Sequence, residues 1–215
     1  MPDERRVLLG TWNPSKQAGL RRLLDGLPVR AVTPEEIGLE EISVREDGWT
    51  FRDNAEYKAR ELARRAGVAT LASDGGLEIP ALRGRWEGLK SRRFAGPGDR
   101  DRITTLLAMM QDIPPESRSA RFHEAVALAE PDGSIVASAQ CAGPIGRIAE
   151  QADPRQHPGF WVPSLWLHPP RWVTEWDLTE DERSCLRTAW DVVGDVLRPT
   201  LADWTAGPSR EPDVW

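Results

Sequence analysis

Residues 71–82 read LASDGGLEIPAL, an apolar run that stops at one aspartate and two glycines and then resumes. The residues that lead up to this stop, VATLAS, are typical of a buried strand, so we expect a strand that ends at Asp74. A carboxylate at the end of a buried strand requires a partner. That partner is a helix end, a metal ion, or a phosphate held through a metal ion.

Length and composition limit the class of protein. The chain has 215 residues, 40% of them hydrophobic, which predicts one domain or two closely joined lobes. No apolar stretch approaches the roughly 20 residues that cross a bilayer, and MPDERRVLLGTWN is unlike a signal peptide. The two cysteines, Cys141 and Cys185, lie far apart and suit a reducing compartment. We therefore expect a cytoplasmic protein with no membrane partner.

The net charge of the chain indicates which classes of ligand it can bind. The formal net charge is −6, and the acids are spread along the chain. A protein that binds duplex nucleic acid needs a basic face, so we expect no such partner. A nucleotide is still compatible, because a few local groups and a divalent cation can hold its phosphates.

The pattern of apolar residues predicts a mixed α/β domain. We expect a single domain over residues 1–204 and a loose C-terminal tail over residues 205–215. The last helix is expected to end at Pro199. Strands are expected at 5–10, 28–33, 68–74, on both sides of the Asp-Gly turn at 132–133, and around 145–149; helices are expected at 13–27, 50–67, 99–113 and 180–199.

Two helix starts carry candidate phosphate-binding groups. The turn TWNPSK brings Thr11, Asn13 and Lys16 to a helix whose cap is Asn13. Backbone N–H groups, the helix dipole and a lysine form a phosphate site. The second start, FRDNAEYKA, holds Asp53 and Lys58. Its simpler interpretation is an acid that complements the helix dipole and a lysine in solvent.

Together these residues suggest a site for a metal and a polyphosphate. Two carboxylates, Asp53 and Asp74, and two lysines follow strands or begin helices, which is typical of a Mg²⁺–polyphosphate site. Only three of the 28 basic residues are lysine. A coding bias toward arginine explains the composition, yet a remaining lysine can mark a place where a compact ammonium is needed.

Seven segments in order resemble the inosine triphosphate pyrophosphatase-like family, enzymes that split non-canonical purine nucleoside triphosphates. The resemblance runs from about residue 7 to residue 190. The family pattern [ST]-G-N-x-x-K appears as TWNPSK, T-F-x-E-N-A-x-x-K-A as TFRDNAEYKA, and A-D-D-S-G-L-x-V-x-A-L as ASDGGLEIPAL. G-x-Y-S-A-R-Y-A-G appears as GLKSRRFAG, R-x-A-x-F as RSARF, G-x-x-G-x-I as GPIGRI, and G-F-G-Y-D-P-I-F as GFWVPSLW.

The resemblance implies an α/β fold of the ITPase-like type, with a central mixed sheet flanked by helices and two lobes that enclose the site in a cleft. It implies Mg²⁺ as cofactor, a nucleotide substrate and a homodimer. Asp74 and Lys58 take the catalytic positions, and Asp53 and Asp74 take the metal-binding positions. The implied substrate-binding residues are Thr11, Trp12, Asn13, Lys16, Gly75, Ser91, Arg93, Phe160, Trp161 and Arg187.

The chain departs from the family most strongly in the residues implied to recognise the base. Trp12 replaces a glycine, Ser73 an aspartate, and Pro163 the aspartate of the last motif. The closing K-x-x-x-S-H-R has no clean counterpart, although a shift of one position lets Arg187 keep the arginine. A polar site without its partners discriminates poorly, so we expect a rebuilt base pocket that accepts a modified nucleotide.

The expected function is Mg²⁺-dependent hydrolysis of a nucleoside triphosphate to the monophosphate and pyrophosphate. Phe160 and Trp161 are expected to stack on the base. The alternative places Trp161 in the core and lets Arg183 or Arg187, one turn apart on the last helix, restore the lost contact. Two other functions stay open: a non-catalytic nucleotide-binding relative, and a phosphohydrolase of nucleoside mono- or diphosphates.

Overall fold

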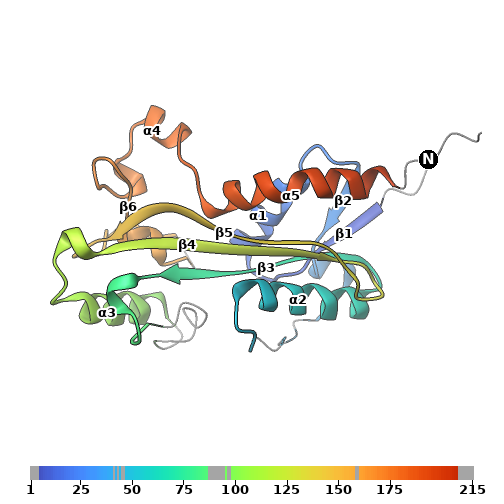
Figure 1. Cartoon of the computed structure of the whole chain (residues 1–215), viewed down its shortest axis with the longest axis horizontal. Coiled ribbons are helices and arrows are strands. Elements are labelled where there is room, and N and C mark those ends of the chain that lie inside the picture. Colours follow the sequence, from blue (N-terminus) through green and yellow to red (C-terminus); the bar gives the residue numbers. More distant parts are fainter. Residues whose placement is uncertain are drawn as a thin grey trace, which may run out of the picture. The chain divides into compact units, whose positions relative to one another are not determined.

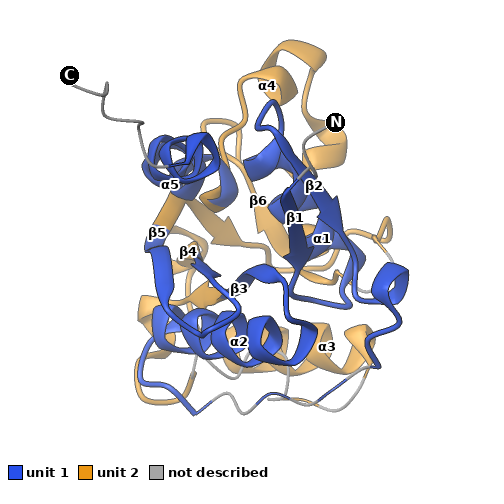
Figure 2. Ribbon diagram, turned by 90° about the vertical axis from the view of Figure 1, so that its right-hand side faces the viewer, with its two compact units in different colours: residues 1–74, 124–141, 190–215 blue, residues 75–123, 142–189 orange. Residues whose placement is uncertain are grey.

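The computed structural model describes residues 5–40, 42, 44, 47–86, 95, 98–157 and 160–207. The chain divides into two compact units, coloured separately in Figure 2. Unit 1 comprises residues 1–74, 124–141 and 190–215, and unit 2 comprises residues 75–123 and 142–189. None of the described helices is both long enough and apolar enough to span a membrane.

A six-stranded mixed sheet has the strand order β2-β1-β3-β4-β5-β6 (Figure 1). Its strands are β1 Arg5–Leu9, β2 Val29–Val32, β3 Ala69–Glu78, β4 Ser119–Ala129, β5 Ile135–Ile148 and β6 Trp166–Leu167. β1 pairs in parallel with β2 and with β3, whereas β5 and β6 are antiparallel. β3, β4 and β5 each contribute residues to both units. The expected α/β class with a central mixed sheet is therefore confirmed.

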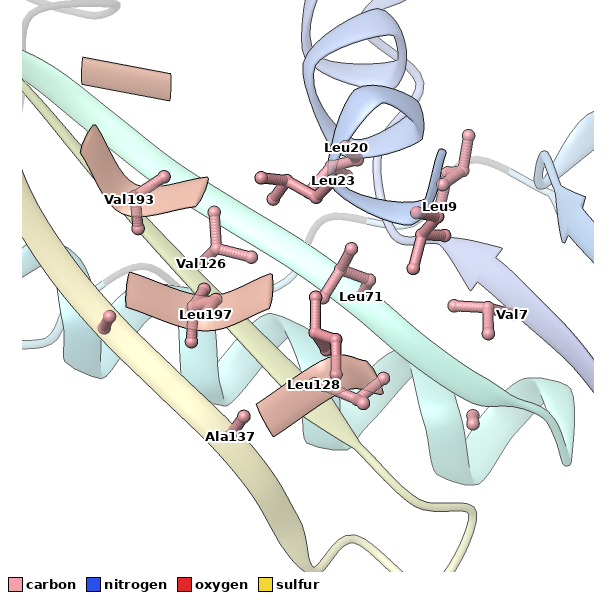
Figure 3. Close-up of a cluster of buried hydrophobic side chains, with 14 residues drawn as sticks. Val7, Leu9, Leu20, Leu23, Leu71, Val126, Leu128, Ala137, Val193 and Leu197 are labelled. Atoms are coloured by element: carbon pink, nitrogen blue, oxygen red, sulfur yellow. The ribbon is translucent and has the colours of Figure 1, made fainter. Parts of the chain in front are cut away.

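Helices cover both faces of the sheet in unit 1 (Figure 1). Helices α1 (Pro14–Leu24) and α5 (Ala189–Ala206) lie on one face, and α2 (Phe51–Ala66) lies on the other. Alternate strand residues point to opposite faces, so β4 supplies both packing surfaces. The α1 and α5 face is closed by Leu20, Leu23, Leu71, Val126, Leu128, Val193 and Leu197 (Figure 3). The α2 face is closed by alanines 55, 59 and 63 of the helix and 72, 125 and 127 of the strands.

Unit 2 has its own core. Helix α3 (Asp99–Met110) buries Ile103, Leu106 and Met110 against a cluster that includes Leu77, Ile148 and Leu165. Helix α4 covers Glu180–Ser184. Short 3-10 helices lie at Glu35–Ile37, Pro80–Leu82, Pro115–Ser117, Val162–Leu165 and Glu175–Asp177.

The predicted start of α1 and end of α2 are confirmed, whereas the predicted limits of two strands are wrong. Asn13 caps α1, with Pro14 as its first residue, and Gly67 ends α2 in the left-handed region at φ 62°. β3 passes through Asp74 and ends at Glu78, because a polar side chain leaves the backbone ladder intact. β5 likewise runs without a break from Ile135 to Ile148, so the separate strand expected around 145–149 is its continuation.

The predicted last helix is also wrong. It divides into α4 and α5, and α5 continues through Pro199 to Ala206. Proline inside a helix costs about 3 kcal/mol, but Leu197 and Leu201 are buried in one cluster on either side of it. Their packing offsets the missing hydrogen bond. The first two residues of the expected tail are thus helical, and residues 208–215 lie outside the described part.

Candidate functional site

The turn between β1 and α1 lies against β3. β1 pairs with β3 as far as Leu9 and Leu71, and the Gly10 N–H then donates to the Leu71 carbonyl at 2.8 Å. A Cβ atom at Gly10 would lie 2.9 Å from the Ala72 Cβ and the Thr70 Cγ2, so only glycine fits this approach. The start of α1 is thereby held beside the segment of β3 that leads to Asp74.

Asn13 uses its side chain to close the start of α1. Its Oδ1 accepts from the Ser15 N–H at 2.9 Å and from the Lys16 N–H at 3.2 Å. The Thr11 hydroxyl accepts from the Asn13 N–H at 3.2 Å. Because these backbone donors are engaged within the turn, the group that α1 presents to Asp74 is the Lys16 ammonium.

Trp12 packs away into an apolar cluster. Its partly buried side chain lies against a group that contains Leu8, Val32 and Leu62. Trp172 is the single described residue other than glycine with a positive φ, so the backbone at Trp12 has no need of a glycine. The structure gives the indole a packing role in unit 1.

The start of α2 holds two acceptor groups in different ways. Asp53 forms a capping box with Thr50: its Oδ2 accepts from the Thr50 N–H at 2.9 Å. The next residue, Asn54, is 1% exposed. Its Oδ1 accepts from the Gly48 N–H at 2.9 Å and its Nδ2 donates to Asp74 Oδ2 at 2.9 Å. Both ends of the amide are bonded, so Asn54 fixes the orientation of Asp74.

Asp74 is buried, and two lysines approach its other oxygen. The Lys58 ammonium donates to Asp74 Oδ1 at 3.3 Å and to the Ser73 carbonyl at 3.3 Å. The Lys16 ammonium lies 3.9 Å from the same Oδ1. The partners of the buried aspartate in the described structure are therefore two ammonium groups and one amide, all in unit 1.

Glu124 is an acid of this region that sequence reasoning missed. It lies on β4, is 1% exposed, and its Oε1 has no hydrogen-bond partner among the described residues. Burial raises its pKa from 4.5 to about 7; Lys16 and Ser73 act in the opposite direction, and the charge of Asp74 adds to the increase. The signal was present in HEAVALA (123–129), where an acid adjoins an apolar run, as in LASD.

The carboxylates suit a cation that is also held by substrate oxygens. Within the described residues, no group of three or more His, Cys, Asp or Glu side chains is placed to hold a metal ion. Mg²⁺ usually keeps several waters and binds through one or two carboxylates and substrate phosphates. Asp74 fits that mode as a carboxylate beside two ammonium groups, whereas the second predicted donor, Asp53, lies at the start of α2, one residue before the Asn54 that contacts Asp74.

The other predicted substrate-binding residues have different surroundings. Trp161 is 7% exposed and belongs to the core of unit 2. Phe160 meets Phe122 edge to face, with ring centroids 6.4 Å apart. Arg187 is exposed between α4 and α5, so Arg183 and Arg187 are not on one helix, contrary to prediction. Gly75 follows Asp74 within β3. Ser91 and Arg93 lie outside the described residues.

Comparison with known proteins identifies the family. The model of the Ham1 family matches residues 7–168, from β1 through the site to β6. The chain belongs to the Ham1 family. Two relatives are named dITP/XTP pyrophosphatase. The protein from Anaeromyxobacter sp. (strain Fw109-5) is 38% identical over 65% of this chain and 74% of its own length. The protein from Anaeromyxobacter dehalogenans (strain 2CP-C) is 33% identical over 94% of this chain and 99% of its own.

A solved Ham1 protein has the same fold. The structure of a HAM1 protein from Coxiella burnetii superimposes with a TM-score of 0.73 at 30% identity, covering 93% of this chain and 99% of the other. The resemblance to the inosine triphosphate pyrophosphatase-like family is thus confirmed for this Ham1 member, as is the expected α/β fold with a central mixed sheet flanked by helices.

Proposed function

We propose that this Ham1 protein is a nucleotide pyrophosphatase that hydrolyses a nucleoside triphosphate to the monophosphate and pyrophosphate. In this proposal Mg²⁺ is the cofactor and the protein acts as a homodimer. The observation that carries the proposal is Asp74, a buried carboxylate oriented by Asn54 and flanked by two ammonium groups. The names of the relatives support the reaction. A hydrolase that acts on phosphoric anhydride bonds needs both a group for water and positive charge for the phosphates.

Asp74 orients the attacking water and accepts its proton. The water oxygen bonds to the α-phosphorus, the bond from that phosphorus to the bridging oxygen breaks, and pyrophosphate leaves with the electron pair. Asn54 donates to one oxygen of Asp74 at 2.9 Å. The carboxylate therefore has a fixed direction before substrate arrives, which lowers the cost of reaching the reactive geometry.

The lysines supply charge for the phosphates. Triphosphate oxygens compete with Asp74 for Lys16, whose ammonium is 3.9 Å from the carboxylate and 28% exposed in its side chain. Lys58 is held more firmly, by the Ser73 carbonyl and by Asp74. Asp53 and Asp74 would hold Mg²⁺, which neutralises charge on the phosphate oxygens when it is bound.

Base recognition is the second part of the proposal. Pro163 stands where the resembling motif has an aspartate, and Pro163 and Trp161 are both buried in unit 2. With few polar groups left for the base edge, the pocket is altered and discriminates weakly between bases. The substrate is then a modified nucleotide or a broad set of nucleotides.

One experiment tests both parts of the proposal. Inosine, xanthosine, adenosine, guanosine and pyrimidine triphosphates are incubated with Mg²⁺, and pyrophosphate and orthophosphate are measured separately. Asp74→Asn should abolish turnover and leave the fold intact, because the side chains are nearly isosteric. Asp203→Asn, on the exposed face of α5, is the matched control and should retain full activity.

The outcomes separate the competing functions. Pyrophosphate release that Asp74→Asn abolishes supports the proposal, and near wild-type activity of that variant contradicts the mechanism. Orthophosphate release favours a mono- or diphosphate substrate, and no release from any nucleotide favours a binding protein. A preference of about a hundredfold for inosine triphosphate would show that base discrimination survives.

A further inference from the structure

Two buried oxygen atoms beside Asp74 have no hydrogen-bond partner among the described residues: Ser73 Oγ and Glu124 Oε1. Ser73 is 1% exposed and Glu124 is 1% exposed. Buried polar atoms without partners are rare in folded proteins, and each calls for an explanation. These two belong to one place, since the Ser73 hydroxyl is close enough to the Glu124 carboxyl to lower its pKa, although neither Ser73 Oγ nor Glu124 Oε1 meets hydrogen-bond geometry with a described residue.

Packing alone does not explain a glutamate here. The following residues of β4, Ala125 to Ala129, are all small or apolar and buried. A buried carboxyl oxygen that accepts no hydrogen bond is unfavourable in such surroundings, so an apolar side chain would serve the core better. The charged groups that act on Glu124 are Lys16 from α1, Lys58 from α2 and Asp74 from β3. Lys16 exerts the largest charge effect of the three.

Lys16 is the cation in this group with the weakest attachment. Lys58 has two acceptors at 3.3 Å, the Ser73 carbonyl and Asp74 Oδ1. Lys16 shares that Oδ1 from 3.9 Å, beyond hydrogen-bonding distance. An ammonium group has three donors, and its attachment to Asp74 must be given up when Asp74 orients the attacking water.

We propose that Glu124 is a positioning residue for Lys16: its buried Oε1 accepts a hydrogen bond from the Lys16 ammonium when the triphosphate is bound, and so aims the other two donors at the distal phosphates. This inference rests on the proposed function. It satisfies the unpaired oxygen and gives the two lysines different roles, Lys58 at Asp74 and Lys16 at the end of the phosphate chain.

A double-mutant cycle with inorganic tripolyphosphate tests the inference without turnover. Tripolyphosphate is titrated calorimetrically into each protein in the presence of Mg²⁺ at pH 8, above the Glu124 pKa of about 7. The proteins compared are wild type, Glu124→Gln, Lys16→Ala and the double variant. Glu130→Gln is the matched control, because Glu130 directly follows β4 and accepts from the Trp204 indole at 2.7 Å. Glu124→Met, similar in volume but apolar, is the second variant. Circular dichroism and thermal melting verify that each variant is folded.

Glu124→Gln and Glu124→Met should each weaken tripolyphosphate binding about tenfold, the size of a lost charge-assisted hydrogen bond. In the Lys16→Ala background the same changes should have an effect below about twofold, and Glu130→Gln should have none. Equal losses in both backgrounds, or no loss in either, would overturn the inference. If Lys16→Ala weakens binding while Glu124→Gln does not, only the inference fails. If wild type does not bind tripolyphosphate, the proposed phosphate site fails as well.

Discussion

Asp74 shows how one residue is prepared by its neighbours for two kinds of contact. Its Oδ2 is bonded to an amide that is itself bonded to Gly48, whereas its Oδ1 faces two ammonium groups. The amide side is rigid because both partners are fixed. The ammonium side can be rearranged, because one lysine lies beyond hydrogen-bonding distance. The contacts of Asp74 that can change are therefore those between Oδ1 and the two lysines.

The buried Glu124 carboxyl should make the free energy of unfolding depend on pH. Burial raises its pKa from 4.5 to about 7, so between these values the folded protein holds a proton that the unfolded chain has lost. The free energy of unfolding must therefore fall as the pH rises through this window. Glutamine cannot ionise. Relative to wild type, Glu124→Gln should gain about 3 kcal/mol of stability between pH 4 and pH 8.

Urea unfolding of both proteins without metal or nucleotide, at half-unit pH intervals, measures this difference. Other titrating groups are common to both proteins and cancel. A difference that stays constant from pH 4 to pH 8 would contradict the raised pKa that burial gives this carboxyl group.

At the scale of elements, α1 and α5 approach closely where a glycine of one meets a tryptophan of the other. A Cβ atom at Gly19 would lie 2.6 Å from the Trp190 ring. Gly19→Ala should therefore destabilise the protein by about 1–3 kcal/mol, although alanine favours a helix. Gly194→Ala is the matched control, since its Cβ would meet only the flexible end of Leu23, at 3.1 Å. Thermal unfolding should show a lower midpoint for Gly19→Ala and an equal or higher one for Gly194→Ala.

The sequence predicted the elements whose limits are set locally. Asn13 with Pro14, and Gly67, act within a few residues of their own helix ends, and both were confirmed. The end of β3 and the course of α5 depend on partners distant in sequence, such as the cluster that holds Leu201 beyond Pro199. Local signals therefore placed a strand end and a helix end too early.

The candidate site followed the same rule. Lys16, Lys58 and Asp74 were predicted from strand ends and helix starts, and they come together in unit 1. Glu124 was missed because only the strand order, with β4 beside β3, brings it near Ser73. Ser73 stands where the resembling motif has an aspartate, so β3 carries one carboxylate fewer than that motif. The additional acid of this region, Glu124, lies on the neighbouring strand β4, outside the motif.

For the whole molecule, the path of the chain predicts cooperative unfolding. Each unit has its own buried cluster, yet β3, β4 and β5 each supply residues to both units. If these three strands unfold in one unit, strands that the other unit shares are disrupted as well. Differential scanning calorimetry should therefore show one transition whose calorimetric and van't Hoff enthalpies agree. Two resolved transitions would show that the units unfold independently.

The scarcity of lysine has a practical consequence for labelling chemistry. The chain has only three lysines, and two of them, Lys16 and Lys58, approach one carboxylate oxygen. Lys90, the third, lies outside the described residues. Reagents that acylate amines therefore have few targets, and Lys16, with a more exposed side chain than Lys58, is the more accessible of the pair. Because acylation would remove the charge of this ammonium, a bound polyphosphate should protect Lys16 from the reagent, and peptide mapping would measure that protection without any engineered cysteine.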